Sequence, residues 1–263
     1  MVSRADGVEK RVLVTGSARG IGLATADLMV EQGWNAVLLD WDGDELRKVA
    51  AERPHMDAIE ADISDPGTVD EVATRLAETG DLCALINNAG VADFGPIADH
   101  DFARWRHILA VNLDGTFLMS QALTPLLKLG FKRRGVTSAI VNVASISGIR
   151  ASTLRVAYGT SKAGVIHLTK QQAVELGEVG IRANCVAPGP VDTKLALAVH
   201  TPAIRKAYHD CMPLNRYGTE REIAEAIAFL ASDRASFVTG QLLNADGGFD
   251  KAGVGLPALR GDS

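Results

Sequence analysis

The sequence predicts an α/β fold in which helices cover both faces of a mainly parallel, doubly wound sheet. Short apolar runs alternate with helical patterns along most of the 263 residues, which is typical of βαβ units joined by right-handed crossovers. No linker, internal repeat or low-complexity segment interrupts the alternation. A chain of this length can build one large core, so we expect a single domain over residues 1–263.

The composition excludes several kinds of protein. The formal net charge is −5, and the longest basic run, Lys132-Arg133-Arg134, is interpreted as a solvated helix end and not as a nucleic-acid surface. No apolar run approaches the roughly 20 residues that span a bilayer, and residues 1–10 are too polar for a signal peptide. The three cysteines have no metal-like spacing. We therefore expect a cytoplasmic protein without a metal and without a nucleic-acid or membrane partner.

The first predicted strand, Val12–Val14, leads directly into a glycine-rich turn that opens a helix over Ile21–Gln32. Glycines at positions 16, 20 and 22 remove side chains where the strand becomes a helix, so backbone amides and the helix N-terminus can meet a pyrophosphate. The Gly-xxx-Gly-x-Gly spacing matches the usual dinucleotide fingerprint in mechanism only. Taken alone, it fits a plain glycine-rich turn as well as the nucleotide site of a Rossmann-type domain.

An acid follows the second predicted strand, Ala36–Leu39. Asp40 lies 24 positions after the first glycine of the turn, about where a carboxylate accepts hydrogen bonds from the adenosine ribose and repels a 2′-phosphate. This favours NAD over NADP. Arg19 favours NADP, because a cation in the phosphate turn can tolerate the extra phosphate, but Trp41 adds no positive charge beside the acid. Asp40 can also be the N-cap of a helix over Asp42–Glu52.

The alternation continues to the end of the fold. The remaining predicted strands are residues 57–61, 82–86, 139–143, 182–186 and 241–245, and the remaining predicted helices are 66–79, 99–129, 157–179 and 220–232. Thr219 is expected to cap the last helix, and Pro125 to break or kink the longest one. Asn112 is locally unfavourable within that long helix, which suggests a function. Residues 249–263 are predicted to form a loop-like tail.

Several polar, glycine or proline residues come directly after predicted strands. They are Gly16, Asp40, Asp62, Asn87, Ser145 and Pro188. Because the carboxyl ends of parallel strands meet at one edge of a sheet, where such sheets bind ligands, these positions predict one site. We expect Asp62 and Ile63 to meet the adenine edge, and the turn Asn87–Gly90 to support the cofactor.

Tyr158 and Lys162 lie four residues apart in a predicted helix, so both side chains project from one face. A neighbouring cation stabilises a phenolate, and moving a tyrosine pKa to neutrality takes roughly 4 kcal/mol. The Ser145 hydroxyl, just after a buried strand, can hold a substrate oxygen beside that phenol. Such a set can exchange protons with an alcohol or a carbonyl. A Tyr and a Lys at this spacing also occur as a solvated surface pair, so the spacing alone leaves both interpretations open.

The chain resembles the short-chain dehydrogenase/reductase family, in its compact single-domain branch, over residues 11–249. The motifs that carry the resemblance are Thr-Gly-xxx-Gly-Ile-Gly at 15–22, Asn-Asn-Ala-Gly at 87–90, Ser145, Tyr-xxx-Lys at 158–162 and Pro-Gly at 188–189. The interval of 13 positions from Ser145 to Tyr158 is the family's usual one. Jointly these motifs are highly specific.

The resemblance implies a role for each matched residue. Tyr158 is expected to be the general acid/base, and Ser145 to polarise the reacting oxygen. Lys162 is expected to hold the nicotinamide ribose and to lower the Tyr158 pKa, while Asn112 supports a proton-relay water. The implied cofactor-binding residues are Gly16, Ala18, Arg19, Gly20, Ile21, Gly22, Asp40, Trp41, Asp62, Ile63, Asn88, Ala89, Gly90, Tyr158, Lys162, Pro188, Gly189, Val191 and Thr193. Of these, Val191 and Thr193 are expected to contact the carboxamide of the nicotinamide. The resemblance also implies a homotetramer, or a homodimer, with the Tyr-bearing helix and its predecessor at one interface.

The segment that this resemblance expects to close over substrate, about residues 192–217, is too ordinary in composition to name a ligand. Its residues His200 and His209 are interpreted as surface residues. Arg150 and Arg155 can meet an anionic or polyhydroxylated substrate, but solvated loop arginines are the simpler interpretation. Val179 stands where 3-oxoacyl reductases of the family commonly carry an arginine, which weakens that option.

Three functions remain open. The first is hydride transfer between NAD(H) and a small-molecule secondary alcohol or ketone, such as a sugar, polyol or hydroxy acid, which Asp40 favours. The second is an NADPH-dependent 3-oxoacyl (carrier protein or CoA) or ketone reductase, which Arg19 favours. The third is a non-catalytic NAD-sensing binding protein, which the intact set of Ser145, Tyr158 and Lys162 disfavours.

Overall fold

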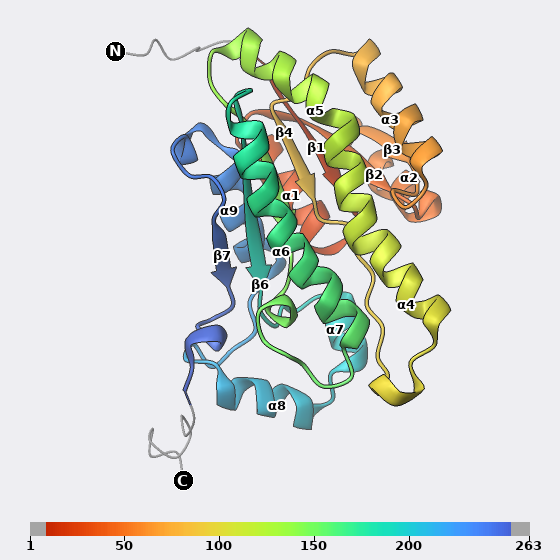
Figure 1. Ribbon diagram of the computed structural model, residues 1–263, viewed down its shortest axis with the longest axis vertical. Coiled ribbons are helices and arrows are strands. Elements are labelled where there is room, and N and C mark those ends of the chain that lie inside the picture. Colours follow the sequence, from red (N-terminus) through yellow and green to blue (C-terminus); the bar gives the residue numbers. More distant parts are fainter. Residues whose placement is uncertain (1–8, 254–263) are drawn as a thin grey trace.

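The computed structural model describes residues 9–253, apart from the side chains of Leu195 and Ala198. Residues 1–8, and residues 254–263 of the predicted tail, lie outside this part. Within it, seven parallel strands form one sheet in the order β3-β2-β1-β4-β5-β6-β7 (Figure 1). The strands are β1 (Lys10–Thr15), β2 (Trp34–Asp40), β3 (Asp57–Glu60), β4 (Ala84–Asn87), β5 (Ser138–Val143), β6 (Ile181–Pro188) and β7 (Leu242–Ala245).

Helices cover both faces of the sheet, which confirms the predicted fold class. One face carries α1 (Gly20–Glu31), α2 (Gly43–Ala51) and α9 (Glu220–Ala231), and the other carries α3 (Pro66–Glu78), α5 (Gly115–Arg134) and α6 (Val156–Gly177). The shorter helices are α4 (Phe102–Leu109), α7 (Lys194–Val199) and α8 (Pro202–Cys211). Figure 1 shows α7 and α8 at the end of the molecule toward which the strand arrows point.

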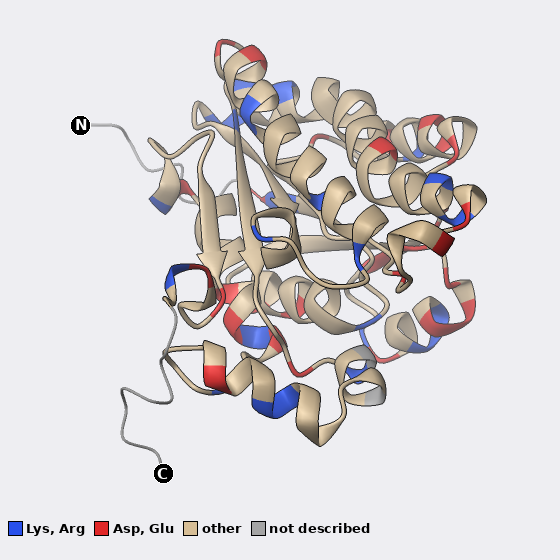
Figure 2. Ribbon diagram, turned by 60° about the horizontal axis from the view of Figure 1, so that its bottom comes forward, with Lys and Arg blue, Asp and Glu red and all other residues tan. Residues whose placement is uncertain are grey.

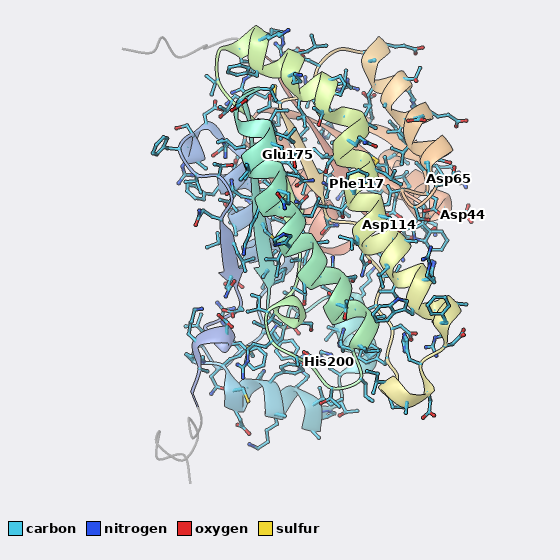
Figure 3. All side chains as sticks on the ribbon, viewed as in Figure 1. Asp44, Asp65, Asp114, Phe117, Glu175 and His200 are labelled. Atoms are coloured by element: carbon cyan, nitrogen blue, oxygen red, sulfur yellow. The ribbon has the colours of Figure 1, made fainter. Side chains whose placement is uncertain are left out.

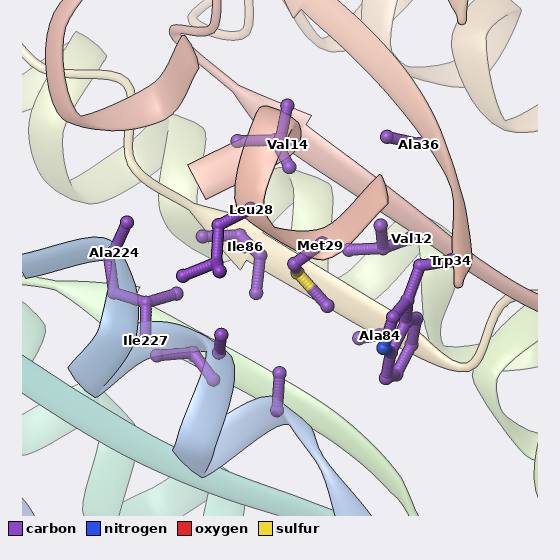
Figure 4. Close-up of a cluster of buried hydrophobic side chains, with 14 of the residues drawn as sticks. Val12, Val14, Leu28, Met29, Trp34, Ala36, Ala84, Ile86, Ala224 and Ile227 are labelled. Carbon is purple, nitrogen blue, oxygen red and sulfur yellow. The ribbon is translucent and has the colours of Figure 1, made fainter. Parts of the chain in front are cut away.

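The core explains why the strand runs are almost wholly apolar. Strands of a parallel sheet are buried on both faces, so they lack the alternation of a half-exposed strand. Val12 and Val14 of β1 pack against Leu28 and Met29 of α1 and Ile227 of α9, all fully or nearly fully buried (Figure 4). Thr219 is the N-cap of α9, as the sequence predicts, and forms a capping box. Its hydroxyl accepts from the backbone amide of Glu222, whose side chain accepts from the Thr219 backbone amide.

The predicted helix over 99–129 is wrong in two respects. It is divided into α4 and α5 by a π-helical turn, Ala110–Asp114, which carries Asn112. Pro125 does not break α5, which continues to Arg134. The proline removes one backbone donor, and Gln121, whose carbonyl would have accepted that bond, lies on the exposed side of the helix. The interruption therefore lies at the turn that carries the asparagine and not at the proline.

The basic run at the end of α5 is only in part the solvated helix end that the sequence suggests: Lys132 and Arg133 are exposed, but Arg134 is not. The Arg134 side chain is buried and forms a 2.6 Å ion pair with Asp233, just after α9. Arg133 pairs with Asp81 at 2.7 Å and donates to the Glu9 carbonyl. Burial of an arginine is tolerated where a carboxylate lies this close, so this end of α5 is fastened to three other segments.

The surface charge and the candidate metal or membrane elements add little to the sequence analysis. Acidic and basic side chains are interspersed over the helices seen in Figure 2. Among residues 9–253, no helix combines the length and the apolar character needed to cross a bilayer, and no cluster of three or more His, Cys, Asp or Glu is placed to hold a metal ion. Cys83 and Cys185 are buried, as predicted, and Cys211 is exposed.

Candidate active site

A cleft of about 1050 Å³ opens beyond the carboxyl ends of β1, β2, β3 and β4. The predicted cofactor-binding residues that line it are Gly16, Ala18, Arg19, Gly20, Asp40, Trp41, Asp62, Ile63, Asn88, Ala89, Gly90 and Thr193. The others, Ile21, Gly22, Tyr158, Lys162, Pro188, Gly189 and Val191, do not line it. Sequence positions that are far apart are thus brought to one edge of the sheet, as the strand ends predict.

The glycine-rich turn is built so that a ligand can approach the backbone closely. Gly16 and Gly20 have φ of +64° and +63°, a region that side chains disfavour. A Cβ at Gly22 would lie 2.1 Å from the Gly16 carbonyl oxygen. This turn leads into the N-terminus of α1, where backbone amides and the helix dipole favour an anion. The cradle therefore fits the pyrophosphate of a dinucleotide.

Asn88 holds this turn in place from the neighbouring strand. Its side-chain amide donates to the carbonyls of Thr15 and Gly16 at 3.0 and 2.9 Å. In return, the Thr15 hydroxyl accepts from the backbone amides of Asn88 and Ala89. Asn88 is therefore a structural support of the cradle, whereas Asn87 is buried in β4 and donates to Ser120 and Asn142 instead.

Asp40 and Arg19, which point to different cofactors in the sequence, have different partners in the structure. The Asp40 carboxylate is only 7% exposed and accepts from the backbone amides of Ala18, at 2.9 Å, and of Asp42, at 3.1 Å. Arg19 is ion-paired with Asp42. Asp42 is also the N-cap of α2, because its side chain accepts from Glu45 N, so the alternative of Asp40 as the cap is wrong.

The two residues that are expected to meet the adenine form the next wall of the cleft. Asp62 accepts from both the backbone amide and the hydroxyl of Ser64, at 2.9 and 2.7 Å, which fixes the turn after β3. Ile63 is buried and packs on Gly115 at the start of α5, where a Cβ would come within 2.7 Å of it. The apolar side chain and the fixed turn suit the flat face of an aromatic base.

Tyr158, Lys162 and Ser145 meet behind the far end of this cleft. Lys162 Nζ lies 5.9 Å from the Tyr158 ring centroid and donates to the Val143 carbonyl at 2.8 Å. A Cβ at Gly90, which lines the cleft, would lie 3.2 Å from the same Nζ. Ser145 is buried at the end of β5, where its hydroxyl accepts from Ser147 N, and it hydrogen-bonds with the Tyr158 side chain.

The electrostatics of the pair differ from the sequence prediction. Burial raises the pKa of Tyr158, and the hydrogen bond with Ser145 and the charge of Arg155 only partly oppose this rise. Burial also lowers the pKa of Lys162 to about 8. The prediction that Lys162 lowers the Tyr158 pKa is therefore not met, because its ammonium is directed to the Val143 carbonyl and the cation that acts on the phenol is Arg155.

Asn112 lies in the π-helical turn with its side-chain amide fully engaged. Its Oδ1 accepts from Val91 N at 2.8 Å, and its Nδ2 donates to the Val91 carbonyl and to Ser161 Oγ. These bonds join the loop after β4 to α6, three residues past the tyrosine. The side chain thus positions the wall of the cleft against α6, and the proton-relay water assigned to Asn112 stays a prediction.

The segment after β6 is held by backbone contacts. Gly189 donates to the Ala245 carbonyl, and a Cβ there would lie 2.7 Å from Asp246 Cα. Val191 is buried and bridges Gly218. Thr193 lines the cleft and caps α7, accepting from Ala196 N at 3.1 Å.

The predicted substrate segment, 192–217, contains α7 and α8 and an aromatic cluster that sequence reasoning missed. His200 stacks on Tyr208 at 5.5 Å and shares a 3.0 Å hydrogen bond with the Tyr217 hydroxyl. Both His200 and His209 are half-buried, and neither lines the cleft, so their interpretation as non-catalytic residues at the surface stays a prediction. Figure 3 shows His200 at the α7–α8 end of the molecule. The grouping of His and Tyr within this short segment was the signal from which the cluster could have been predicted.

The lowered pKa of Lys162 predicts a pH-dependent cost to stability. A lysine whose pKa falls from 10.5 to about 8 on folding is less stable as an ammonium in the folded state than in the unfolded state. This cost is fully present below about pH 8 and vanishes as pH rises through about 10.5. Relative to Lys162→Met, the wild type should gain about 3 kcal/mol in the free energy of unfolding across that window. Urea unfolding near the two ends of the window measures it, and a constant difference would contradict the assignment.

Comparisons with known proteins agree over nearly the whole chain. A family model described as enoyl-(acyl carrier protein) reductase matches residues 16–250. Cis-4-hydroxycyclohexanecarboxylate dehydrogenase of Sinomonas cyclohexanicum is 38% identical over 248 residues, which cover 92% of this chain and 96% of the relative. The 3-oxoacyl-(acyl-carrier-protein) reductase FabG of Thermotoga maritima is 34% identical over 244 residues, covering 91% and 97%. The solved structure of a short-chain type dehydrogenase/reductase from Mycobacterium ulcerans has a TM-score of 0.87 and 29% identity, and covers 95% of this chain and 93% of that one.

Proposed function

Because the chain belongs to the short-chain dehydrogenase/reductase family and is an NAD(P)-dependent oxidoreductase acting on CH–OH groups, we propose that it oxidises a small secondary alcohol with NAD. The substrate class that we propose is a sugar, a polyol or a hydroxy acid. The relative that acts on a hydroxycyclohexanecarboxylate supports the last of these.

The observation that carries the proposal is the meeting of Ser145, Tyr158 and Lys162 behind the end of a cleft whose other end fits a dinucleotide. When bound, the nicotinamide supplies the hydride acceptor. Tyr158 Oη, as the phenolate beside the Arg155 and Lys162 cations, would take the proton of the substrate hydroxyl, and Ser145 Oγ would hydrogen-bond the same oxygen while negative charge develops on it. Lys162 Nζ, which lies next to Gly90 at the cleft wall, would hold the nicotinamide ribose.

Two contacts support NAD over NADP. The buried Asp40 carboxylate, fixed by backbone amides, would repel a 2′-phosphate. Arg19, which favours NADP in the sequence, is paired with Asp42 and is not free to neutralise such a phosphate without losing that partner.

We also propose that the active form is a cytoplasmic homotetramer, assembled in part through α5 and α6. Phe117 on α5 and Val174 on α6 are 46% and 75% exposed, and Phe102 on α4 is 70% exposed. In Figure 3, Phe117 and Glu175 mark the face that these two long helices turn toward the viewer. Exposed apolar residues on adjacent helices are typical of a subunit interface, and light scattering on the purified protein would measure the assembly.

A second candidate is an NADPH-dependent 3-oxoacyl or ketone reductase. The 34% identity to the Thermotoga maritima reductase supports it, whereas Val179 in place of an arginine does not. The NAD-sensing binding protein has no support beyond the fold, because Ser145, Tyr158 and Lys162 are all present.

The test is a panel of secondary alcohols, sugars, hydroxy acids and ketones, including 3-oxoacyl thioesters, followed by NAD(P)H absorbance with each cofactor. We expect oxidation of hydroxy compounds with NAD at a kcat/KM at least about 10-fold above that with NADP. Faster reduction of 3-oxoacyl thioesters with NADPH would favour the second candidate, and cofactor binding without any turnover would favour the third.

A further inference from the structure

Arg155 stands out among the cations around the site, because its guanidinium has neither a counter-ion nor a hydrogen-bond acceptor. Within residues 9–253, no carboxylate lies within ion-pair distance of its guanidinium, and its side chain makes no hydrogen bond. It is nevertheless half-buried. A partly buried charge without a partner is unfavourable, so this arginine is available to an anion.

The neighbouring arginines differ in this respect. Arg150, in the same loop, donates to the Phe249 carbonyl at 2.7 Å and stacks on the Phe249 ring. Arg205 pairs with Asp192 at 2.8 Å, and Arg104 pairs with Asp93. Arg155 is thus the cation near the tyrosine that has neither an acid nor a hydrogen-bond acceptor as partner in the described part of the chain, whereas Lys162 donates to the Val143 carbonyl.

Its position is set by the loop that precedes α6. The Arg155 guanidinium carbon lies 5.3 Å from the Tyr158 ring centroid and 4.1 Å from that of Phe94. The backbone of this arginine bridges Gly95, and Leu154 before it has φ of +62°, which is strained for a leucine. The same loop contact, Gly95 N to the Leu154 carbonyl at 3.0 Å, holds the strained residue. The fold therefore fixes the guanidinium beside the phenol.

We propose that Arg155 binds a carboxylate of the substrate, so that the substrates are hydroxy acids and not neutral alcohols; this inference rests on the proposed function. One guanidinium supplies two parallel donors that match the two oxygens of a carboxylate. It also supplies one positive charge, which suits a monocarboxylate better than a phosphate. The substrate hydroxyl then lies at Tyr158 and Ser145, and its apolar atoms lie against Phe94, which is 42% exposed.

The proposal is tested with matched acid and amide pairs: 3-hydroxybutyrate with 3-hydroxybutyramide, and gluconate with gluconamide. For the wild type, we expect kcat/KM to be about 10- to 100-fold higher for the acids, the range of a charge-assisted hydrogen bond. Arg155→Met should reduce this acid-to-amide ratio to near one, and Arg155→Lys should retain part of it. Arg150→Met makes the same charge change in the same loop and should leave the ratio unchanged.

A binding arm removes the dependence on a particular substrate. Cyclohexanecarboxylate and cyclohexanecarboxamide are titrated into the enzyme–NADH complex by calorimetry, with wild type, Arg155→Met and Arg150→Met. The acid should bind about 10-fold or more tightly than the amide to the wild type and to Arg150→Met, which retain Arg155. For Arg155→Met, the two ligands should bind equally. Equal binding of acid and amide to the wild type, or a preference that survives in Arg155→Met, overturns the proposal. Either result leaves the dehydrogenase function standing, whereas failure of NADH to bind at all would overturn that function first.

Discussion

Replacing Tyr158 by phenylalanine is expected to lower kcat by about 10²- to 10⁴-fold, to or near the limit of detection. The substitution removes only the phenol oxygen, the group that would take the substrate proton, and with it the hydrogen bond to Ser145, while the ring still packs against Arg155. Because the cradle for the cofactor lies at the other end of the cleft, NADH should bind nearly as tightly as to the wild type. Steady-state rates and a fluorescence titration with NADH measure the two effects.

The control for this variant lies one half-turn away on the same helix. Thr160→Val also removes a hydroxyl from α6, but Thr160 is exposed, so turnover should stay close to that of the wild type. Turnover retained in Tyr158→Phe would refute the assignment of the general acid/base. A parallel loss of turnover in Thr160→Val would indicate damage to the helix instead of loss of a proton acceptor.

The fold and the edge of the sheet were predictable because both follow from local patterns. Buried parallel strands are apolar throughout, and each strand end is a fixed position in the sequence. Gly16, Asp40 and Ser145 could therefore be assigned to one edge without knowing any contact. The same reasoning gave the spacing of Tyr158 and Lys162, which depends only on helical periodicity.

The sequence could not predict contacts between side chains that are distant along the chain. The ion pair of Arg134 with Asp233 joins residues 99 positions apart, so a basic helix end could not be distinguished from a buried anchor. The direction of the Lys162 ammonium, toward the Val143 carbonyl, depends on the packing of α6 on β5. From the sequence alone, Arg155 is interpreted as a solvated loop arginine. The structure shows that the bridge to Gly95 fixes it beside the phenol.

Replacing Asp40 by alanine is expected to raise the ratio of kcat/KM with NADP to that with NAD by about 10²-fold, since a like-charge contact costs several kcal/mol. The ratio is the quantity to compare. Loss of the carboxylate also removes the acceptor of Ala18 N, which weakens the cradle for both cofactors alike. Adding Asp42→Asn should raise the ratio further, because Arg19 then loses its ion-pair partner and becomes available to the 2′-phosphate.

Asp44→Asn is the matched control for the Asp40 prediction. It also removes one negative charge near the start of α2, but Asp44 is exposed, pairs with Arg47 and does not line the cleft. Its cofactor ratio should therefore equal that of the wild type. If Asp44→Asn shifted the ratio as much as Asp40→Ala, the preference would come from the overall charge at this edge. If neither variant shifted it, the carboxylate would not select the cofactor, and the choice between NAD and NADP would have to be sought in Arg19 and Asp42 alone.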